Sequence, residues 1–303
     1  MRIRSQLLAA GVAAALAVTL TACSDSDPAE QTPQSGNQYA AGDLTLDARP
    51  EHIVSLSAAA TEMLFAIDAG DQVTAVDQTS NYPDGVPTTD LDAFTPNVEA
   101  IAGYEPDLVV LSHDQEDIVA KLAEVNIPVY YAPAATTVDD TYQQITDLGA
   151  LTGHSDEAET LTTQMAGTID ELVGGLPQTD EPLSVYYELD PNLYSLTSQT
   201  FAGSLLALAG LENIADAADD AEATGGYPQL SQEFVLDADP DLIFVTVGGE
   251  EAVEELLDRD GWDTVSAVKN HNVVALDEDI ASRWGPRIVD LMGDITDAVV
   301  QAA

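Results

Sequence analysis

The feature that most constrains the fold of this chain is a repeat with an offset of 134 residues, the separation between Asn97 and Ser231. The first copy reads Asn-Val-Glu-Ala-Ile at 97–101 and Glu-Pro-Asp-Leu-Val-Val at 105–110, and the second reads Ser-Gln-Glu-Phe-Val at 231–235 and Asp-Pro-Asp-Leu-Ile-Phe at 239–244. Asn and Ser are good helix N-caps, and a glutamate in the first turn is favoured by the helix dipole. Each copy therefore predicts a short helix, a Pro-Asp turn and a buried strand, at equivalent places in two similar lobes.

Short apolar runs alternate with helical segments on both sides of this repeat. We expect strands at 53–56, 73–76, 108–111, 129–131, 185–187, 242–247 and 273–276. We expect helices at 61–69, 117–124, 138–151, 201–209, 252–257 and 288–300. Apolar strands that alternate with helices predict parallel sheets covered on both faces. The sequence thus predicts an α/β fold of two Rossmann-like lobes, each a mostly parallel sheet flanked by helices.

One long helix is expected between the lobes. Its apolar stripe recurs at spacings of three and four through Ala158, Leu161, Met165, Ile169 and Leu172. The helix begins near Ser155, and Gly-Gly at 174–175 followed by Pro177 ends it. We therefore expect an N-terminal lobe over 49–152, a rigid connecting helix over 153–176 and a C-terminal lobe over 177–303.

The N-terminus is predicted to be a targeting segment. Two arginines precede an apolar run from Leu7 to Leu20, which is shorter than the roughly 20 residues that a membrane-spanning helix needs. Such a pattern is typical of a secretory signal peptide, here 1–22. The sequence Leu-Thr-Ala-Cys that ends at Cys23 resembles a bacterial lipobox, which implies cleavage before Cys23 and its lipidation. Residues 23–48, rich in small and polar residues, then predict a flexible tether on an extracytoplasmic protein anchored to the bacterial cell membrane.

The charge of the chain restricts its partners. It has 54 acidic and 8 basic residues, for a formal net charge of -46. Nucleic-acid binding requires clusters of Lys and Arg, and charge-driven docking on anionic lipid requires the same. The acidic excess therefore argues against both kinds of partner.

Several short motifs now carry a family resemblance. They are Arg-Pro-Glu-His-Ile-Val-Ser-Leu at 49–56, Asn-Tyr-Pro at 81–83, Pro-Asn-Val-Glu at 96–99, Ala-Gly-Leu-Glu-Asn-Ile at 209–214, Ser-Gln-Glu at 231–233 and Gly-Pro-Arg at 285–287. The chain resembles the periplasmic-type solute-binding proteins of ABC importers that carry ferric siderophores, haem and cobalamin. The resemblance implies two lobes joined by one long helix, with the ligand in the cleft between them. It also implies a monomer that captures a metal chelate for the importer.

The resemblance further implies that Glu99 and Glu233, one on each lobe, pair with arginines of the membrane permease. The alternative is that both glutamates only stabilise the ends of their helices. Matching register in two lobes favours a two-point docking surface.

The expected ligand-binding residues lie where strands end, because ligands of open α/β sheets bind beyond the carboxyl ends of the strands. From those loops and from the resemblance we expect ligand contacts from Ser57, Tyr82, His113, Tyr131, Tyr194, Tyr227, Arg283 and Trp284. Aromatic side chains with polar tips suit a large, flat, partly apolar chelate. An Arg-Trp pair in a Gly-Pro loop has little structural reason to exist, which favours a binding role for both residues.

The scarcity of cations near the expected cleft points to a neutral or weakly charged ligand, such as a hydroxamate siderophore or a cobalamin-type corrinoid. Haem is an alternative, in which His113 is the candidate axial ligand. The four histidines, at 52, 113, 154 and 271, form no cluster, so no bound metal ion and no cofactor are expected. The alternative of a different class is a membrane-tethered hydrolase, but the chain has no Gly-x-Ser-x-Gly, His-Glu-x-x-His or phosphate-loop motif. We expect no enzyme.

Overall fold

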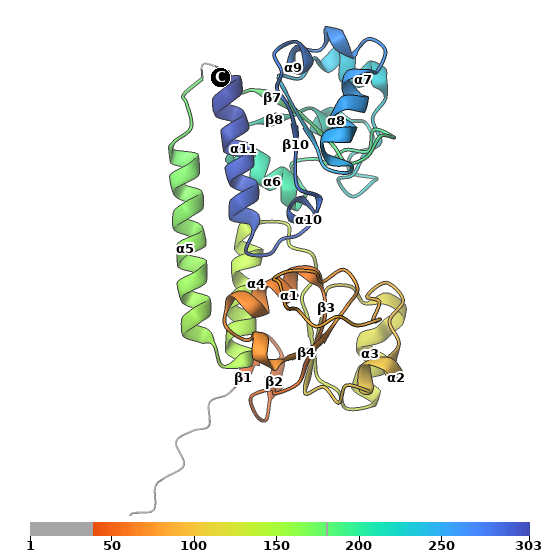
Figure 1. Cartoon of the computed structure of the whole chain (residues 1–303), viewed down its shortest axis with the longest axis vertical. Coiled ribbons are helices and arrows are strands. Elements are labelled where there is room, and N and C mark those ends of the chain that lie inside the picture. Colours follow the sequence, from red (N-terminus) through yellow and green to blue (C-terminus); the bar gives the residue numbers. More distant parts are fainter. Residues whose placement is uncertain (1–38, 180) are drawn as a thin grey trace, which may run out of the picture. The chain divides into compact units, whose positions relative to one another are not determined.

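The computed structural model describes residues 39–179 and 181–303, and its core consists of two parallel sheets flanked by helices (Figure 1). The strands of the N-terminal lobe are β3 (Ile53–Leu56), β4 (Val73–Val76), β5 (Leu108–Leu111) and β6 (Val129–Tyr131), in the order β4-β3-β5-β6. Those of the C-terminal lobe are β7 (Ser184–Glu188), β8 (Glu212–Asn213), β9 (Leu242–Val245) and β10 (Val273–Ala275), in the order β8-β7-β9-β10. Both sheets thus place their first strand between the second and third. The predicted fold class is confirmed.

Helices cover these sheets at nearly the predicted places. They are α1 (Ala58–Ala66), α2 (Val98–Ala102), α3 (Ile118–Glu124), α4 (Val138–Thr152), α5 (Ser155–Gly174), α6 (Phe201–Leu208), α7 (Gln232–Ala238), α8 (Gly249–Leu257), α9 (Ser266–Lys269), α10 (Glu278–Ala281) and α11 (Ile288–Ala302). Short 3-10 turns lie at Gly70–Gln72, Gln115–Asp117, Ile214–Ala217 and Trp262–Thr264. Helix α1 begins three residues before the predicted start, because Ser57 Oγ accepts a hydrogen bond from Ala60 N at 3.3 Å and caps the helix.

The 134-residue repeat is a repeat of structure. Asn97 Oδ1 accepts from Ala100 N at 2.9 Å, and Ser231 Oγ accepts from Phe234 N at 3.1 Å, so both expected N-caps form. The register repeats too, since β5 begins opposite Ile53 of β3 at Leu108, and β9 begins opposite Val185 of β7 at Leu242. The residues before the two prolines, Glu105 and Asp239, both have left-handed backbone angles.

The aspartate of each Pro-Asp turn has a structural role. Asp107 Oδ2 accepts from the backbone N–H groups of Glu51 and His52 at 2.9 and 3.0 Å. Asp241 Oδ2 accepts from the N–H and the hydroxyl of Ser184 at 2.9 and 2.8 Å. Each carboxylate therefore joins the start of the third strand of its sheet to the start of the first strand.

Helix α5 follows the N-terminal lobe and precedes the C-terminal lobe in the chain (Figure 1). Its 20 residues correspond to a length of about 30 Å. Ala158, Met165 and Ile169 are buried, and the helix packs against α4 and α11. A Cβ at Gly149 of α4 would lie 2.5 Å from the Cβ of Ala158, so this glycine permits the close approach of the two helices.

The predicted flexible tether is wrong for its last part. Residues Tyr39–Ala41 (β1) and Leu44–Leu46 (β2) form an antiparallel hairpin that packs against α4. Ala41 and Leu46 are buried in the core, and Gly42 supplies the left-handed turn, with a φ of 54°. This short strand pair was hidden by its polar surroundings in the sequence.

The predicted signal peptide, Cys23 and the first part of the tether lie outside the described residues. Within the part of the chain that is described, no helix combines the length and the apolar character needed to cross a membrane.

Candidate functional site

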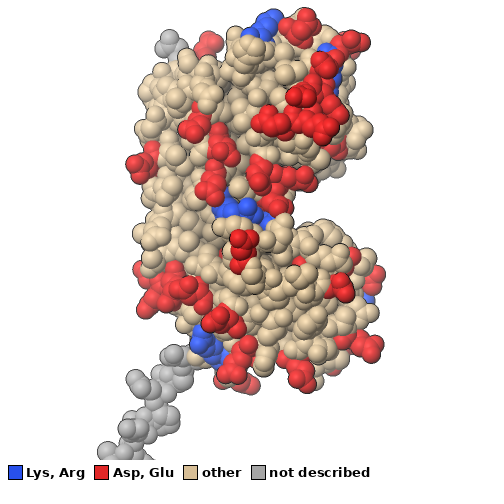
Figure 2. All heavy atoms as spheres, viewed as in Figure 1, with Lys and Arg blue, Asp and Glu red and all other residues tan. Residues whose placement is uncertain are grey.

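A cavity lies at the carboxyl ends of the N-terminal strands, and we call it the Ser57 cavity. Its volume is about 350 Å³. Ser57, Asp77 and Ser112 line it, and each follows directly after a strand of the sheet, β3, β4 and β5 respectively. The lining also includes Glu278, Asp279, Ser282, Arg283 and Trp284, and we call residues 278–287 the wall segment. The face drawn in Figure 2 is hollowed between the two lobes, and acidic side chains outnumber basic ones over it.

A network of buried hydroxyl groups lies beside the Ser57 cavity. Thr61 Oγ1 lies 2.8 Å from Ser55 Oγ and 3.0 Å from Ser80 Oγ. The two oxygens of the buried Asp77 carboxylate accept from Ser80 Oγ at 2.5 Å and from Thr79 Oγ1 at 2.6 Å. Because buried polar groups require partners, this network gives the loop over 77–80 one defined conformation.

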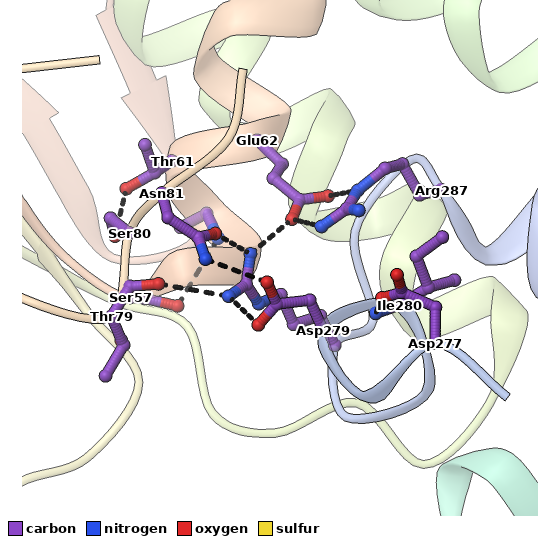
Figure 3. Close-up of polar contacts among 12 residues, drawn as sticks. Ser57, Thr61, Glu62, Thr79, Ser80, Asn81, Asp277, Asp279, Ile280 and Arg287 are labelled. Atoms are coloured by element: carbon purple, nitrogen blue, oxygen red, sulfur yellow. Dashed lines mark hydrogen bonds and ion pairs between the residues drawn. The ribbon is translucent and has the colours of Figure 1, made fainter. Parts of the chain in front are cut away.

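Glu62 of α1 is a buried carboxylate that binds two arginines of the wall segment (Figure 3). Arg283 Nη1 donates to its Oε1 at 2.9 Å, while Arg287 Nη2 and Nε donate to Oε1 and Oε2 at 2.6 and 3.0 Å. The side chains of Glu62, Arg283 and Arg287 are only 1, 8 and 16% exposed. The hydrogen bonds to Glu62 raise the pKa of Arg287. A carboxylate at this depth requires such pairing, since an unpaired buried charge is strongly destabilising.

The guanidinium of Arg283 has further partners. It donates to Asn81 Oδ1 at 2.8 Å, to Thr79 O at 3.0 Å and to Asp279 Oδ1 at 2.5 Å. Asn81 Nδ2 in turn donates to Asp279 Oδ2 at 2.8 Å (Figure 3). Two carboxylates therefore balance the charge of Arg283, which lines the cavity as a paired group and not as a free cation.

Trp284 is also held by the N-terminal lobe. Its Nε1 donates to Gln144 Oε1 at 3.0 Å, and its carbonyl accepts from Thr141 Oγ1 at 3.0 Å. Both partners belong to α4. The Arg-Trp pair thus has structural contacts that the sequence did not reveal, while both side chains still line the Ser57 cavity.

Two rings of the cavity lining, those of Phe94 and His113, lie together. The Phe94 ring is 60% exposed and lies 5.7 Å from the His113 ring, at an angle of 42°. Ser112 Oγ lies 3.1 Å from His113 Nδ1. The loop of Phe94 is ordered by Asp92, whose carboxylate accepts from Phe94 N at 2.8 Å and from Thr95 N and Oγ1 at 3.3 and 2.8 Å. These hydrogen bonds lower the pKa of Asp92.

The structure brings together four of the eight residues expected to bind ligand. The cavity is lined by Ser57, His113, Arg283 and Trp284. The other four have exposed rings that lie outside its lining: Tyr82, Tyr131, Tyr194 and Tyr227. Arg287 Cζ lies 4.2 Å from the centre of the Tyr82 ring, and Tyr131 lines a separate cavity beside the β1–β2 hairpin.

Sequence reasoning missed Glu62 and Phe94. Glu62 had one signal, because it is the single charged residue in the apolar helix Ala-Ala-Ala-Thr-Glu-Met-Leu-Phe-Ala. The signal for Phe94 was weaker. It is the Asp-x-Phe-Thr pattern, in which the aspartate side chain can accept hydrogen bonds from the backbone of the turn that follows it.

The cavity carries an excess of negative charge. Asp77, Glu278 and Asp279 line it, and the one arginine of the lining, Arg283, is already paired with Glu62 and Asp279. Among residues 39–179 and 181–303, no group of three or more His, Cys, Asp or Glu side chains is arranged to hold a metal ion.

Glu99 and Glu233 occupy the first turns of α2 and α7, as the repeat predicted. Both side chains are exposed. Within the described part of the chain, neither forms an ion pair.

Comparisons with known proteins agree with this architecture. The family model described as "Periplasmic binding protein" matches residues 53–280. An uncharacterized ABC transporter substrate-binding lipoprotein of Bacillus subtilis, YvrC, is 29% identical, with 96% of each chain covered. A cobalamin-binding protein of Halobacterium salinarum is 30% identical, over 95% of this chain and 83% of the relative. A possible iron-binding, periplasmic solute-binding protein of Staphylococcus epidermidis superposes with a TM-score of 0.72 at 26% identity, covering 83% of this chain and 99% of that structure.

Proposed function

The chain belongs to the periplasmic binding protein family, and from this premise we propose that it captures a metal chelate outside the cytoplasm and delivers it to an ABC importer. Members of this family are solute-binding transport proteins and not enzymes. The observation that carries the proposal is the Ser57 cavity, which lies at the carboxyl ends of one parallel sheet and is also lined by the wall segment.

The charges of the cavity favour a neutral or cationic chelate. Three carboxylates line it, and its one arginine is already paired with Glu62 and Asp279. An anionic chelate would meet these carboxylates without a free cation to offset the repulsion. A cobalamin-type corrinoid or a ferric hydroxamate therefore fits better than a ferric catecholate, and the cobalamin-binding relative favours the corrinoid.

The rings at the cavity suit an apolar, flat ligand. Phe94, His113 and Trp284 all offer aromatic surface to the same space. A corrinoid is larger than the cavity, which would hold only part of it. We propose that the exposed rings of Tyr82, Tyr131, Tyr194 and Tyr227 are the candidates for contacts with the rest.

Delivery requires a membrane partner. We propose that Cys23 carries the lipid anchor and that Glu99 and Glu233 contact cationic residues of the permease. The exposure of both carboxylates and their equivalent places on two lobes support this docking role.

Equilibrium titration of the purified protein tests the ligand. Cyanocobalamin and a ferric trihydroxamate are compared with haemin and a ferric tris-catecholate, each followed by calorimetry. We expect one of the two neutral chelates to bind at least about tenfold more tightly than the tris-catecholate, a difference of about 1.4 kcal/mol. Failure of all four chelates to bind would contradict the proposal, and strongest binding of haemin would replace the corrinoid with haem.

A further inference from the structure

We propose that Glu62 is a positioning residue that fastens the wall segment to the N-terminal lobe. The Ser57 cavity then has its shape before ligand arrives. The part of this inference that concerns ligand affinity rests on the proposed function, whereas the part that concerns the wall segment does not.

The lining of the cavity is the first support. Ten of its residues precede α4 in the chain, and the remaining five belong to the wall segment: Glu278, Asp279, Ser282, Arg283 and Trp284. No strand of the C-terminal sheet, as described, contributes to the lining. In chain order the wall segment follows β10. Apart from Asp279, however, the hydrogen-bond partners named above for Arg283, Trp284 and Arg287 belong to the N-terminal lobe.

Three sets of contacts hold the wall segment there. The first is the Glu62 carboxylate with Arg283 and Arg287, and the second is Asn81 with Arg283 and Asp279. The third joins Trp284 to α4. Of these, the Glu62 set is the most buried, so solvent screens it least and its charge-assisted hydrogen bonds are the strongest.

The backbone approaches α1 closely at the same point. A Cβ at Gly285 would lie 2.9 Å from Glu62 Oε2, 3.4 Å from Glu62 Cβ and 3.5 Å from Ala59 O. A glycine between Trp284 and Arg287 therefore lets both arginines reach one carboxylate.

Loss of the Glu62 charge should loosen the wall. Without it, Arg283 and Arg287 are two buried cations with one carboxylate fewer between them, and their repulsion favours separation from α1. Trp284 then keeps only its two hydrogen bonds to α4, so its place at the cavity is less firmly fixed although its own side chain is unchanged.

The chain provides a matched control. Glu188 is also 1% exposed and also accepts two hydrogen bonds from one guanidinium, that of Arg259, at 2.6 and 2.7 Å. This pair lies within the C-terminal lobe and does not line the Ser57 cavity. Glu62→Gln and Glu188→Gln remove the same charge from equally buried sites, so both should lower the melting temperature.

Hydrogen exchange and ligand titration of the full mature chain distinguish the two variants. We expect Glu62→Gln to accelerate amide exchange over residues 279–287 by at least about tenfold and to weaken cyanocobalamin binding by at least about tenfold, as the loss of a buried charge partner does. Glu188→Gln should change neither quantity by more than about twofold. Gly285→Ala, which disturbs the same junction without removing charge, should reproduce the effect of Glu62→Gln and serves if Glu62→Gln does not fold.

The outcomes separate this inference from the proposed function. If the wild type binds no chelate, the proposed function fails while the exchange data still test the role of Glu62. Unchanged exchange over 279–287 in both Glu62→Gln and Gly285→Ala would overturn the inference. Equal losses of affinity in Glu62→Gln and Glu188→Gln would overturn it as well, since they would reflect general destabilisation.

Discussion

The two lobes share one strand order but use their buried carboxylates differently. In the C-terminal lobe, Glu188 pairs with Arg259 and accepts from Tyr186 Oη at 3.1 Å, and Arg259 Cζ lies 4.9 Å from the centre of the Trp262 ring. This whole cluster lies inside one lobe. In the N-terminal lobe, Glu62 pairs with arginines more than 200 residues later in the chain, as the separation of 221 between Glu62 and Arg283 shows. A buried carboxylate thus stabilises the inside of the C-terminal lobe, whereas in the N-terminal lobe a buried carboxylate binds the wall segment of the Ser57 cavity.

The hydrophobic cores of the two lobes also differ in the side chains that they contain. Beside α2 and α3 the N-terminal core is aliphatic, with Val54, Leu56 and Leu111, whereas the C-terminal core contains the buried rings of Tyr186 and Trp262. Burial and the neighbouring Glu188 raise the pKa of Tyr186, so its hydroxyl stays protonated and continues to donate. A ring-rich, internally braced lobe and a lobe with an open cavity therefore arise from one repeated topology.

The largest expected effect concerns the equivalent positions of the two lobes. Glu99→Ala with Glu233→Ala should reduce chelate uptake by cells more than about tenfold, because a charge at a rim contact steers and aligns the complex. Either single variant should have a smaller effect. Ligand affinity should not change, and stability should fall by a few tenths to about 1 kcal/mol per site.

Glu251→Ala is the control for the docking variants, because it removes a first-turn carboxylate from α8 and leaves both repeat copies intact. Its uptake should equal that of the wild type. Normal uptake by the double variant, together with a slightly lower melting temperature, would contradict the docking role. The two glutamates would then only stabilise their helices, and the lobes would be equivalent in fold but not in function.

A smaller effect is expected when one aromatic ring is removed, either from the lining of the Ser57 cavity or from outside it. Trp284→Ala should weaken binding of the preferred chelate by about 1–3 kcal/mol, as the loss of a buried aromatic contact does. Tyr227→Ala should cost less than about 1 kcal/mol, because its ring is half exposed and lies outside the cavity lining. Calorimetric titration measures both, with circular dichroism as the test of fold. A greater loss from Tyr227→Ala would move the site to the C-terminal lobe.

The smallest effect is a contrast in the pH dependence of stability. Hydrogen bonds from Thr136 and Thr137 lower the pKa of Asp140 below its usual 3.8, whereas burial and then Asp290 raise the pKa of Asp294. The Asp140 carboxylate therefore stabilises the fold above pH 3.8, and this stabilisation is lost as the pH falls through its folded pKa. The ionised Asp294 destabilises the fold above its raised pKa, and acid relieves this.

Opposite substitution effects follow at neutral pH. Asp140→Asn should lower the free energy of unfolding and Asp294→Asn should raise it, each by about 0.5 kcal/mol after solvent screening. Urea denaturation at pH 7 and pH 3 measures the differences, which should both shrink at pH 3. Changes of the same sign at pH 7 would contradict the assignment of the two environments.

The sequence predicted the elements whose signals are local. Strands such as Ile53–Leu56 and the N-caps at Asn97 and Ser231 depend on neighbouring residues, and they lie where they were expected. The β1–β2 hairpin was missed, because only two of its side chains are buried and the burial depends on α4.

The candidate site was predicted less completely for the same physical reason. The rule that ligands bind beyond the carboxyl ends of strands identified the loops of Ser57 and His113. The partners of Glu62, however, lie far along the chain, and no spacing rule connects them with it. The balanced charge of Arg283 likewise depends on Asp279, Asn81 and Glu62 meeting in space. Long-range pairing of this kind has no local pattern.

The most direct test of the central claim is a crystal structure of the protein with the chelate that binds most tightly in the titration. We expect the chelate to lie against Phe94, His113 and Trp284, with both arginines of the wall segment still bound to Glu62. A chelate bound elsewhere, or one that contacts only the C-terminal lobe while the Ser57 cavity stays empty, would contradict it.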